Sequence, residues 1–160
     1  MKQVKIITAQ EAAQLVKDND GVTTNGFVGS GQPEALTSAL EEWFVETGSP
    51  KNLTLIYATS QGNTDGRGGD HFAHEGMLKK AILGHWNAVT ALQKLVNDNK
   101  IEAYNLPQGT LSQYFRDVAA HRLGTITHVG LDTFADPRVT GGKLNDVTKE
   151  VSPFDATPCP

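Results

Sequence analysis

Hydrophobic positions along the chain repeat with two periods, one typical of amphipathic helices and one typical of strands. Apolar side chains three and four positions apart predict helices at 8–18, 33–48, 88–97 and 110–121, with a shorter helix at 72–79. Runs rich in β-branched and aromatic side chains predict strands at 21–28, 53–58, 101–106 and 125–131, and KAILGHW at 80–86 is a further apolar run. Helices and strands therefore alternate along the chain.

Residues at the ends of these segments support the predicted boundaries. Thr8 and Glu11 have the spacing of a capping box, Pro33 stands at a first helical position, and Gly48 is placed to end the helix that Pro33 begins. Parallel strands need a long crossover connection, so strands that alternate with helices predict βαβ units. We expect an α/β fold with an open, mainly parallel sheet and helices on both faces, as in Rossmann-like three-layer folds.

Composition and charge restrict the partners of this chain. Its 160 residues, 38% of them hydrophobic, suffice for one core, which we place at 1–150, with an irregular tail at 151–160. The formal charge of -4 and the lack of any run of Lys or Arg argue against nucleic acid as a partner. No stretch approaches the roughly 20 apolar residues of a membrane span. The single cysteine, Cys159, can form no internal disulfide, so we expect a cytoplasmic protein.

Candidate chemistry gathers where the predicted strands end. In an open parallel sheet, ligands bind beyond the carboxyl ends of the strands, which here lead into NGFVGSGQPE, ATSQGNTDGRGGD, GHWN and NLPQGT. The amides of Gly29, Ser30 and Gly31 would suit an anion or a developing oxyanion near a helix N-terminus, but the same residues also suit a plain tight turn. The Walker loop and the dinucleotide fingerprint fit poorly, because Gln32 and Glu34 replace residues that those motifs need.

Titratable side chains near these loops do not form a recognised catalytic or metal-binding pattern. His71, His74 and Glu75 lack the spacing of a zinc-binding helix, and no nearby cysteine completes a ligand set, so we predict no metal site. The glutamates of the second predicted helix fit its first turn or its solvated face better than the role of a nucleophile; they are Glu34, Glu41 and Glu42.

Gln108 lies where a predicted strand ends and a helix begins, in a turn shaped by Pro107 and Gly109. Its amide would point into the same crevice as the Gly29 loop, where an uncharged amide can hold a carboxylate without titrating. A polar residue that caps the helix before Thr110 explains the position equally well.

Three stretches taken together resemble one protein family. NGFVGSGQPEALTSAL, YNLPQGTLSQYFR and GLDTFADPRVTGGKLNDVTKE are similar, in this order, to segments of the N-terminal half of class I coenzyme A transferases, most closely the single-chain acetate and propionate type. HEGMLKKAILGHW, which lies between them, fits as well. The likeness runs from about Ala9 to about Glu150, and three ordered motifs are more specific than one glycine loop.

The resemblance implies a reaction and a set of binding residues. Members of this family use an open α/β sheet to move CoA from an acyl-CoA to a free carboxylate through a glutamyl-CoA thioester. CoA thioester is then a substrate, and no cofactor is bound permanently. The resemblance implies that the acyl group lies beside the turn of the first motif, Gly26, Phe27, Gly29, Ser30 and Gly31. It also implies that Gln108, next to Gly109, orients the carboxylate or the nucleophilic glutamate.

The chain departs from the family pattern at the nucleophile. The family's glutamate stands in a Glu-x-Gly context of the second half, whereas HEG at Glu75 lies in the stretch that matches the first half. We therefore expect no catalytic residue in this chain, and the sequence also leaves the family pattern after Glu150. We expect a domain or subunit that a C-terminal half or a separate chain completes. An oligomer or hetero-complex is expected because uncovered sheet edges and apolar faces associate.

Two other functions fit the sequence less closely. A non-catalytic module that binds an acyl-CoA or a small carboxylate would use the same pocket without turnover. A sugar-phosphate isomerase-like enzyme would need an acid–base pair, for which Asp65 and His85 are the candidates.

Overall fold

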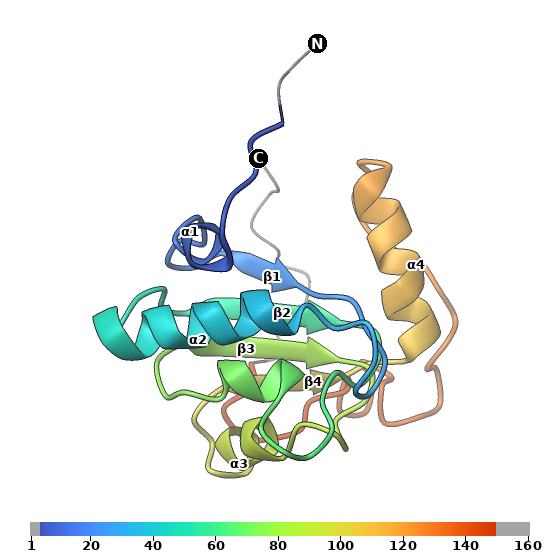
Figure 1. Cartoon of the computed structure of the whole chain (residues 1–160). Helices are drawn as coiled ribbons and strands as arrows, with labels where there is room; N and C mark the ends of the chain where they lie inside the picture. Colours follow the sequence, from blue (N-terminus) through green and yellow to red (C-terminus); the bar gives the residue numbers. More distant parts are fainter. Residues whose placement is uncertain (1–3, 150–160) are drawn as a thin grey trace.

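Residues 4–149 are described by the computed structural model as an open, four-stranded parallel sheet with helices packed against it (Figure 1). The elements in chain order are α1 (Ala9–Ala13), β1 (Gly21–Thr23), α2 (Glu34–Thr47), β2 (Leu53–Tyr57), the 3-10 helix η1 (Gly68–Phe72), β3 (Leu78–Leu83), α3 (Thr90–Asn97), β4 (Glu102–Asn105) and α4 (Gln108–Ala119). The strand order is β1-β2-β3-β4, and every pair is parallel. The predicted α/β class is confirmed.

Several local signals form the contacts that the sequence predicted. The Glu11 N–H donates to Thr8 Oγ1 at 3.1 Å, and the Thr8 N–H donates to the Glu11 carboxylate at 2.8 Å, which completes the capping box of α1. Pro33 precedes α2 as its N-cap, and Gly48 ends the helix in the left-handed conformation with φ 70°. Helix α2 and strand β2 therefore lie where the hydrophobic pattern placed them.

Two predicted segments are shorter in the structure, since the strand expected at 21–28 ends at Thr23 and the helix expected at 8–18 ends at Ala13. Two others do not form. The prediction of a helix at 72–79 is wrong: a 3-10 helix covers Gly68–Phe72, and β3 already begins at Leu78. The strand expected at 125–131 is also wrong, since these residues form turns. The free side of β4 is instead contacted by the stretch around Lys143, whose bridge to Tyr104 is flanked by hydrogen bonds to Ala103 and Asn105. The outer edge of β4 is therefore not available to 125–131.

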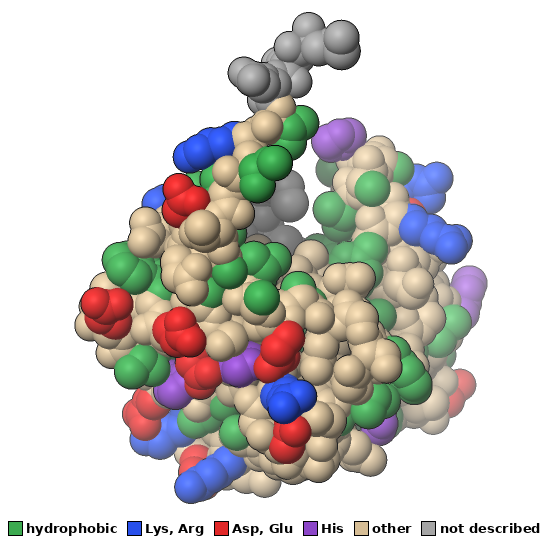
Figure 2. Space-filling view, in the orientation of Figure 1, with side chains coloured by type: hydrophobic (Ala, Val, Ile, Leu, Met, Phe, Trp, Pro, Cys, Tyr) green, Lys and Arg blue, Asp and Glu red, His purple; other side chains and the backbone are tan. Residues whose placement is uncertain are grey.

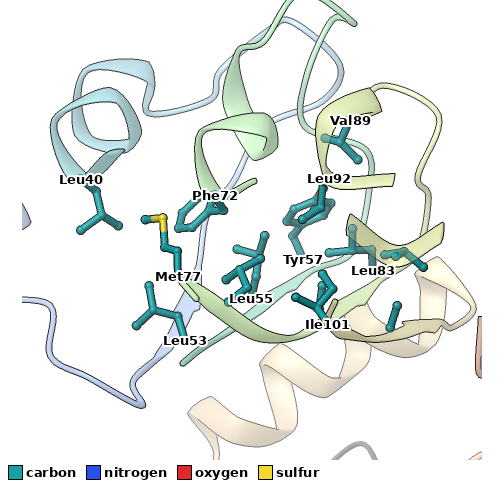
Figure 3. Close-up of a cluster of buried hydrophobic side chains, with 14 of the residues drawn as sticks. Leu40, Leu53, Leu55, Tyr57, Phe72, Met77, Leu83, Val89, Leu92 and Ile101 are labelled. Atoms are coloured by element: carbon teal, nitrogen blue, oxygen red, sulfur yellow. The ribbon is translucent and has the colours of Figure 1, made fainter. Parts of the chain in front are cut away.

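The hydrophobic core has two parts, one on each face of the sheet. Alternate residues of β2 (Leu53, Leu55 and Tyr57) point to the face covered by α2, η1 and α3, where Leu40, Phe72 and Leu92 pack on them (Figure 3). A smaller cluster on the other face contains Ile82, Tyr104, Leu106 and Leu111. Because Leu111 belongs to α4, this helix reaches the second face, while the earlier helices cover the first.

The segment after α4 leaves large apolar side chains exposed. They include Leu123, Ile126, Val129, Leu131, Phe134 and Val139. Between residues 4 and 149, no helix has both the length and the apolar character needed to cross a membrane. The tail predicted from Val151 onward and Cys159 lie outside the described residues, so their assignment stays a prediction.

Candidate functional site

Four loops meet at the edge of the sheet toward which all strands point (Figure 1). The Val28 N–H donates to the Ser60 carbonyl at 2.8 Å, and the Gly62 N–H donates to the Val28 carbonyl at 3.0 Å, which joins the loops after β1 and β2. Ser60 Oγ accepts from the Ala88 N–H at 3.1 Å and thereby adds the loop after β3. The loop after β4 lies alongside, because the Leu106 N–H donates to the Leu83 carbonyl at 3.0 Å.

The segment from Gly26 to Gly31 folds into a tight turn. Phe27 and Ser30 exchange two backbone hydrogen bonds of 2.9 and 3.0 Å, and Val28 between them has φ 52°. Gly26 has φ 135°, and a Cβ atom added there would lie 2.9 Å from the backbone nitrogen of Gln32. The backbone alone therefore requires glycine at position 26.

Only some amides of this turn are available to a ligand. The N–H groups of Phe27, Val28 and Ser30 already donate within the turn or to Ser60. Gly29 and Gly31 are exposed, and their N–H groups donate to no acceptor within residues 4–149. A Cβ on Gly29 would meet only the Asn63 side chain, at an ordinary 3.7 Å. Packing does not explain the glycine at 29, so the prediction of an oxyanion donor remains open there.

Gln108 and Gly109 lie in the first turn of α4, which Pro107 precedes as N-cap. Gln108 is exposed, and a Cβ added to Gly84 would lie 2.7 Å from its Cγ and would collide with the Ala58 carbonyl. Gly109 has open space around it. Among residues 4–149, no hydrogen bond joins Gln108 to the glycine turn, so its predicted role rests on the shared edge of the sheet.

A pocket of about 810 Å³ opens beside the glycine turn, and Figure 2 shows the surface hollowed between α1 and α4. Its apolar walls come from α1 and the residues just after it, β1, α2 and α4, and include Val16, Val22, Leu36, Leu40 and Phe115. Its polar lining includes Gln61, whose Nε2 donates to the Thr24 carbonyl at 2.7 Å, and Thr59. The hydroxyl oxygen of Thr59 is buried and lacks a partner within the described part of the chain. Gly26 lines the same pocket.

The glutamates of α2 are engaged in ion pairs and hydrogen bonds with the residues after β2. Glu34 Oε1 lies 2.8 Å from His71 Nε2, and its Oε2 accepts from the Gly68 N–H at 3.1 Å. Glu41 binds His71 Nδ1 at 2.6 Å and His74 Nε2 at 2.5 Å. Because both oxygens of each carboxylate are occupied, neither glutamate is free to attack a substrate.

These interactions also change how the groups titrate. Burial by itself lowers the pKa of His71, but the hydrogen bonds and charges of Glu34 and Glu41 outweigh it, so the net pKa lies above the usual histidine value. Burial raises the pKa of Glu41, but the bonds from His74 and His71 prevail and hold it below the usual value. Over residues 4–149, no three His, Cys, Asp or Glu side chains are placed to hold a metal ion.

Among residues 4–149, three other titratable candidates form no hydrogen bond with the Gly26–Gly31 turn. Glu75 is exposed, precedes β3 at the opposite edge of the sheet and pairs with Lys100 at 3.1 Å. Asp65 accepts from Asn63 Nδ2 at 2.8 Å on the surface of its loop. His85 is exposed after β3, and within residues 4–149 no hydrogen bond joins it to Asp65. The acid–base pair of an isomerase is therefore not assembled by these contacts.

Sequence reasoning misses two residues that build this edge. Gly84 keeps β3 close to Ala58 and Gln108, and its signal was a glycine directly after a buried strand. Gln61 is buried, and the Thr24 hydroxyl donates to its Oε1 at 2.5 Å across 37 positions of sequence. No local pattern announces a contact of that separation.

Comparison with known proteins begins with a family model for coenzyme A transferase, which matches residues 6–159. Acetate CoA-transferase YdiF of Escherichia coli (strain K12) is 43% identical over 150 residues, which cover 92% of this chain and 28% of that protein. Caffeate CoA-transferase of Acetobacterium woodii is 40% identical over 146 residues, or 91% of this chain and 28% of that protein. Acetate CoA-transferase subunit alpha of Escherichia coli (strain K12) is 28% identical over 84% of this chain and 58% of its own length.

Solved structures show the same fold. The apoenzyme of acyl-CoA transferase YdiF from Escherichia coli O157:H7 gives a TM-score of 0.88 at 41% identity, over 91% of this chain and 28% of that chain. The thioester complex of the same enzyme with CoA gives a TM-score of 0.86 at 41% identity, over 89% of this chain and 28% of that chain. The chain thus spans only 28% of the length of YdiF. By its matched family model and these relatives, the chain belongs to the coenzyme A transferase family, as its motifs predicted.

Proposed function

We propose that this chain is the N-terminal part of a CoA-transferase that moves CoA from a short-chain acyl-CoA to a free carboxylate through a glutamyl-CoA thioester. One observation carries the proposal. The edge of the sheet combines amide donors at Gly29 and Gly31, which have no acceptor within residues 4–149, with an adjacent apolar pocket. Both oxygens of Glu34, three positions after Gly31, and of Glu41 in the same helix are already engaged. This arrangement suits the stabilising half of an acyl-transfer site.

The glycine turn supplies the electrostatic part of the reaction. Acyl transfer at a thioester carbonyl passes through a tetrahedral oxyanion, and fixed N–H donors stabilise that charge most where water is excluded. In our proposal, Gly29 and Gly31 donate to this oxygen, while Gly26, Phe27 and Ser30 shape the wall beside the acyl group. Gln108, in the first turn of α4 with Gly109, holds the substrate carboxylate through its uncharged amide.

The nucleophilic glutamate comes from polypeptide outside these 160 residues. The curated relatives YdiF and caffeate CoA-transferase are each more than three times as long as their matched part, since the chain covers 28% of either. The relative named subunit alpha supports a second arrangement, in which a separate chain completes the enzyme. The partners in our proposal are therefore an acyl-CoA, a small carboxylate and the polypeptide that carries the glutamate.

Complementation tests the proposal. The chain is mixed with the part of Escherichia coli YdiF that it does not match, and CoA transfer from acetyl-CoA to propionate is followed by mass spectrometry. We expect transfer only in the mixture, with CoA bound as a thioester to the YdiF portion. A CoA adduct on this chain alone would disprove the missing nucleophile. Micromolar binding of acetyl-CoA by calorimetry, without transfer in any mixture, would instead indicate a non-catalytic binding module.

A further inference from the structure

A buried histidine connects α2 to the residues that follow β2. His71, in η1, contacts Glu34 through Nε2 at 2.8 Å and Glu41 through Nδ1 at 2.6 Å. An ionised carboxylate can only accept hydrogen bonds, so His71 satisfies both contacts at once when both of its ring nitrogens donate, as they do in an imidazolium. Charge-assisted bonds of this kind are about twice as strong as neutral ones. Figure 2 shows acidic and histidine side chains gathered over α2 and η1.

The contacts of Glu34 continue to the glycine turn and close a ring. Glu34 is the first residue of α2, shortly after Gly31, and its second oxygen accepts from the Gly68 N–H. The neighbouring Gly69 N–H donates to the Gln61 carbonyl at 2.6 Å. Gln61 in turn binds Thr24, just before the turn. The ring therefore runs from the turn through α2, η1 and the loop after β2 back to the turn.

The ring is closely packed at its centre. A Cβ atom on Gly68 would collide with Gln32 Oε1 and lie 2.5 Å from the Gln61 carbonyl oxygen. The loop after β2 thus lies directly against the residue that follows the glycine turn. Because Glu34 Oε2 accepts from the Gly68 N–H and Gly68 has no room for a Cβ beside the Gln61 carbonyl, a shift of Glu34 would displace the loop after β2.

We propose that His71 is a positioning residue, whose bonds to Glu34 and Glu41 fix the Gly26–Gly31 turn before substrate binds. The inference rests on the proposed function, since the turn is taken to hold the oxyanion. Donors that are already fixed need no reorganisation when charge develops, so loosening them lowers the rate of acyl transfer more than the binding of substrate.

His74 provides a matched control. It binds the same helix through Glu41 at 2.5 Å, but among the described residues it has no bond to Glu34 or Gly68. Its ring also contacts Phe44, with ring centroids 5.9 Å apart, near the end of α2 remote from the turn. His74→Gln therefore removes an ion pair from α2 but leaves intact the ring of contacts that joins Glu34 and Gly68 to the glycine turn.

The first measurement is amide hydrogen exchange by NMR on the 160-residue chain. In His71→Gln we expect the Val28, Gly62 and Gly68 amides to exchange about tenfold faster or more, and in His74→Gln we expect them to change by less than about threefold. Equal effects of the two variants, or no effect of His71→Gln, would overturn the proposal. If His71→Gln does not fold, Glu34→Gln replaces it, because it removes the carboxylate that joins His71 to the turn.

The second measurement is transfer kinetics in the mixture with the complementary YdiF portion. We expect His71→Gln to lower kcat by about tenfold or more with KM for acetyl-CoA nearly unchanged, whereas His74→Gln changes neither. A raised KM with unchanged kcat would contradict positioning. If the wild-type mixture shows no transfer, the proposed function fails, while the exchange data still decide whether His71 orders the turn.

Discussion

Some glycines assigned to the site are required by the fold, and others have only a proposed functional role. Alanine substitutions distinguish the two groups. Gly26→Ala is expected to destabilise the fold, because its φ of 135° disfavours a side chain and the new Cβ would lie 2.9 Å from the Gln32 nitrogen. Gly29→Ala meets only an ordinary contact of 3.7 Å with Asn63 and is expected to leave the fold intact. Its effect should appear in function alone.

The magnitudes follow from the geometry. At Gly26, a strained backbone conformation costs about 1–3 kcal/mol and overpacking a similar amount, so we expect a loss of about 2–6 kcal/mol. Gly31 has φ 71°, and the atom nearest to an added Cβ would lie at an ordinary 3.9 Å. Gly31→Ala should therefore cost only the strain of the left-handed conformation, about 1–2 kcal/mol. Gly29→Ala should change stability by less than about 0.5 kcal/mol. Gly109→Ala, inside α4 with open space, should gain about 0.5–1 kcal/mol.

Urea unfolding followed by circular dichroism measures these differences on the chain itself, and transfer in the mixture with the YdiF portion measures function. We expect Gly29→Ala to lose about tenfold or more in transfer, because its Cβ would stand where the oxyanion approaches. A Gly29→Ala variant as unstable as Gly26→Ala would show that the described geometry of the turn is wrong. Full transfer by a stable Gly29→Ala variant would remove Gly29 from the site.

Two further predictions concern stability. Because the pKa of His71 is raised in the folded state, its ion pairs contribute fully to stability below the usual histidine pKa of 6.5. This contribution is lost as pH rises through the folded-state pKa. Urea midpoints should therefore show that His71→Gln costs more stability at pH 6 than at pH 9. Asp70 accepts from the Ala91 and Leu92 N–H groups at 3.1 Å each, so Asp70→Ala should cost about 1–2 kcal/mol by the same assay, with an unchanged midpoint as the refuting result.

Local signals predicted the parts of the fold that depend on neighbouring residues. Helix α2 has a proline before it, a glycine after it and an apolar face between them, and all three are visible within sixteen positions. Strand β2 is a mostly apolar run in which alternate residues are fully buried and those between them partly buried, as expected of a central strand. The family motifs then identified the transferase fold, which the comparisons confirmed.

The errors arose where distant residues decide the structure. The helix expected at 88–97 begins at Thr90, where Asp70, more than twenty positions away, accepts from the Ala91 and Leu92 amides. The β-branched run at 125–131 has strand composition, yet residues near Lys143 contact β4 instead. A propensity describes what a segment can form, whereas a strand also needs an available edge.

The glutamates of α2 illustrate a correct conclusion reached for the wrong reason. Glu34 was assigned to the helix dipole and Glu41 to a solvated face, but each is held by histidine, and Glu34 also binds the Gly68 amide. Only Glu42 is exposed as expected. The pairing could not be predicted, because it joins positions at least thirty residues apart.

This pairing also bears on the charge of the proposed site. An unpaired carboxylate at Glu34, just after the glycine turn, would oppose both the oxyanion and an incoming glutamate, since like charges repel most strongly where water is excluded. The His71 imidazolium offsets that charge, and the ring of contacts directs both Glu34 oxygens to His71 and Gly68. The Gly29 and Gly31 amides are thus left as the nearest polar donors of the turn. In our proposal, the negative charge that the reaction needs comes from the partner polypeptide, and it meets a surface where the carboxylate that follows the glycine turn, Glu34, is already paired with His71.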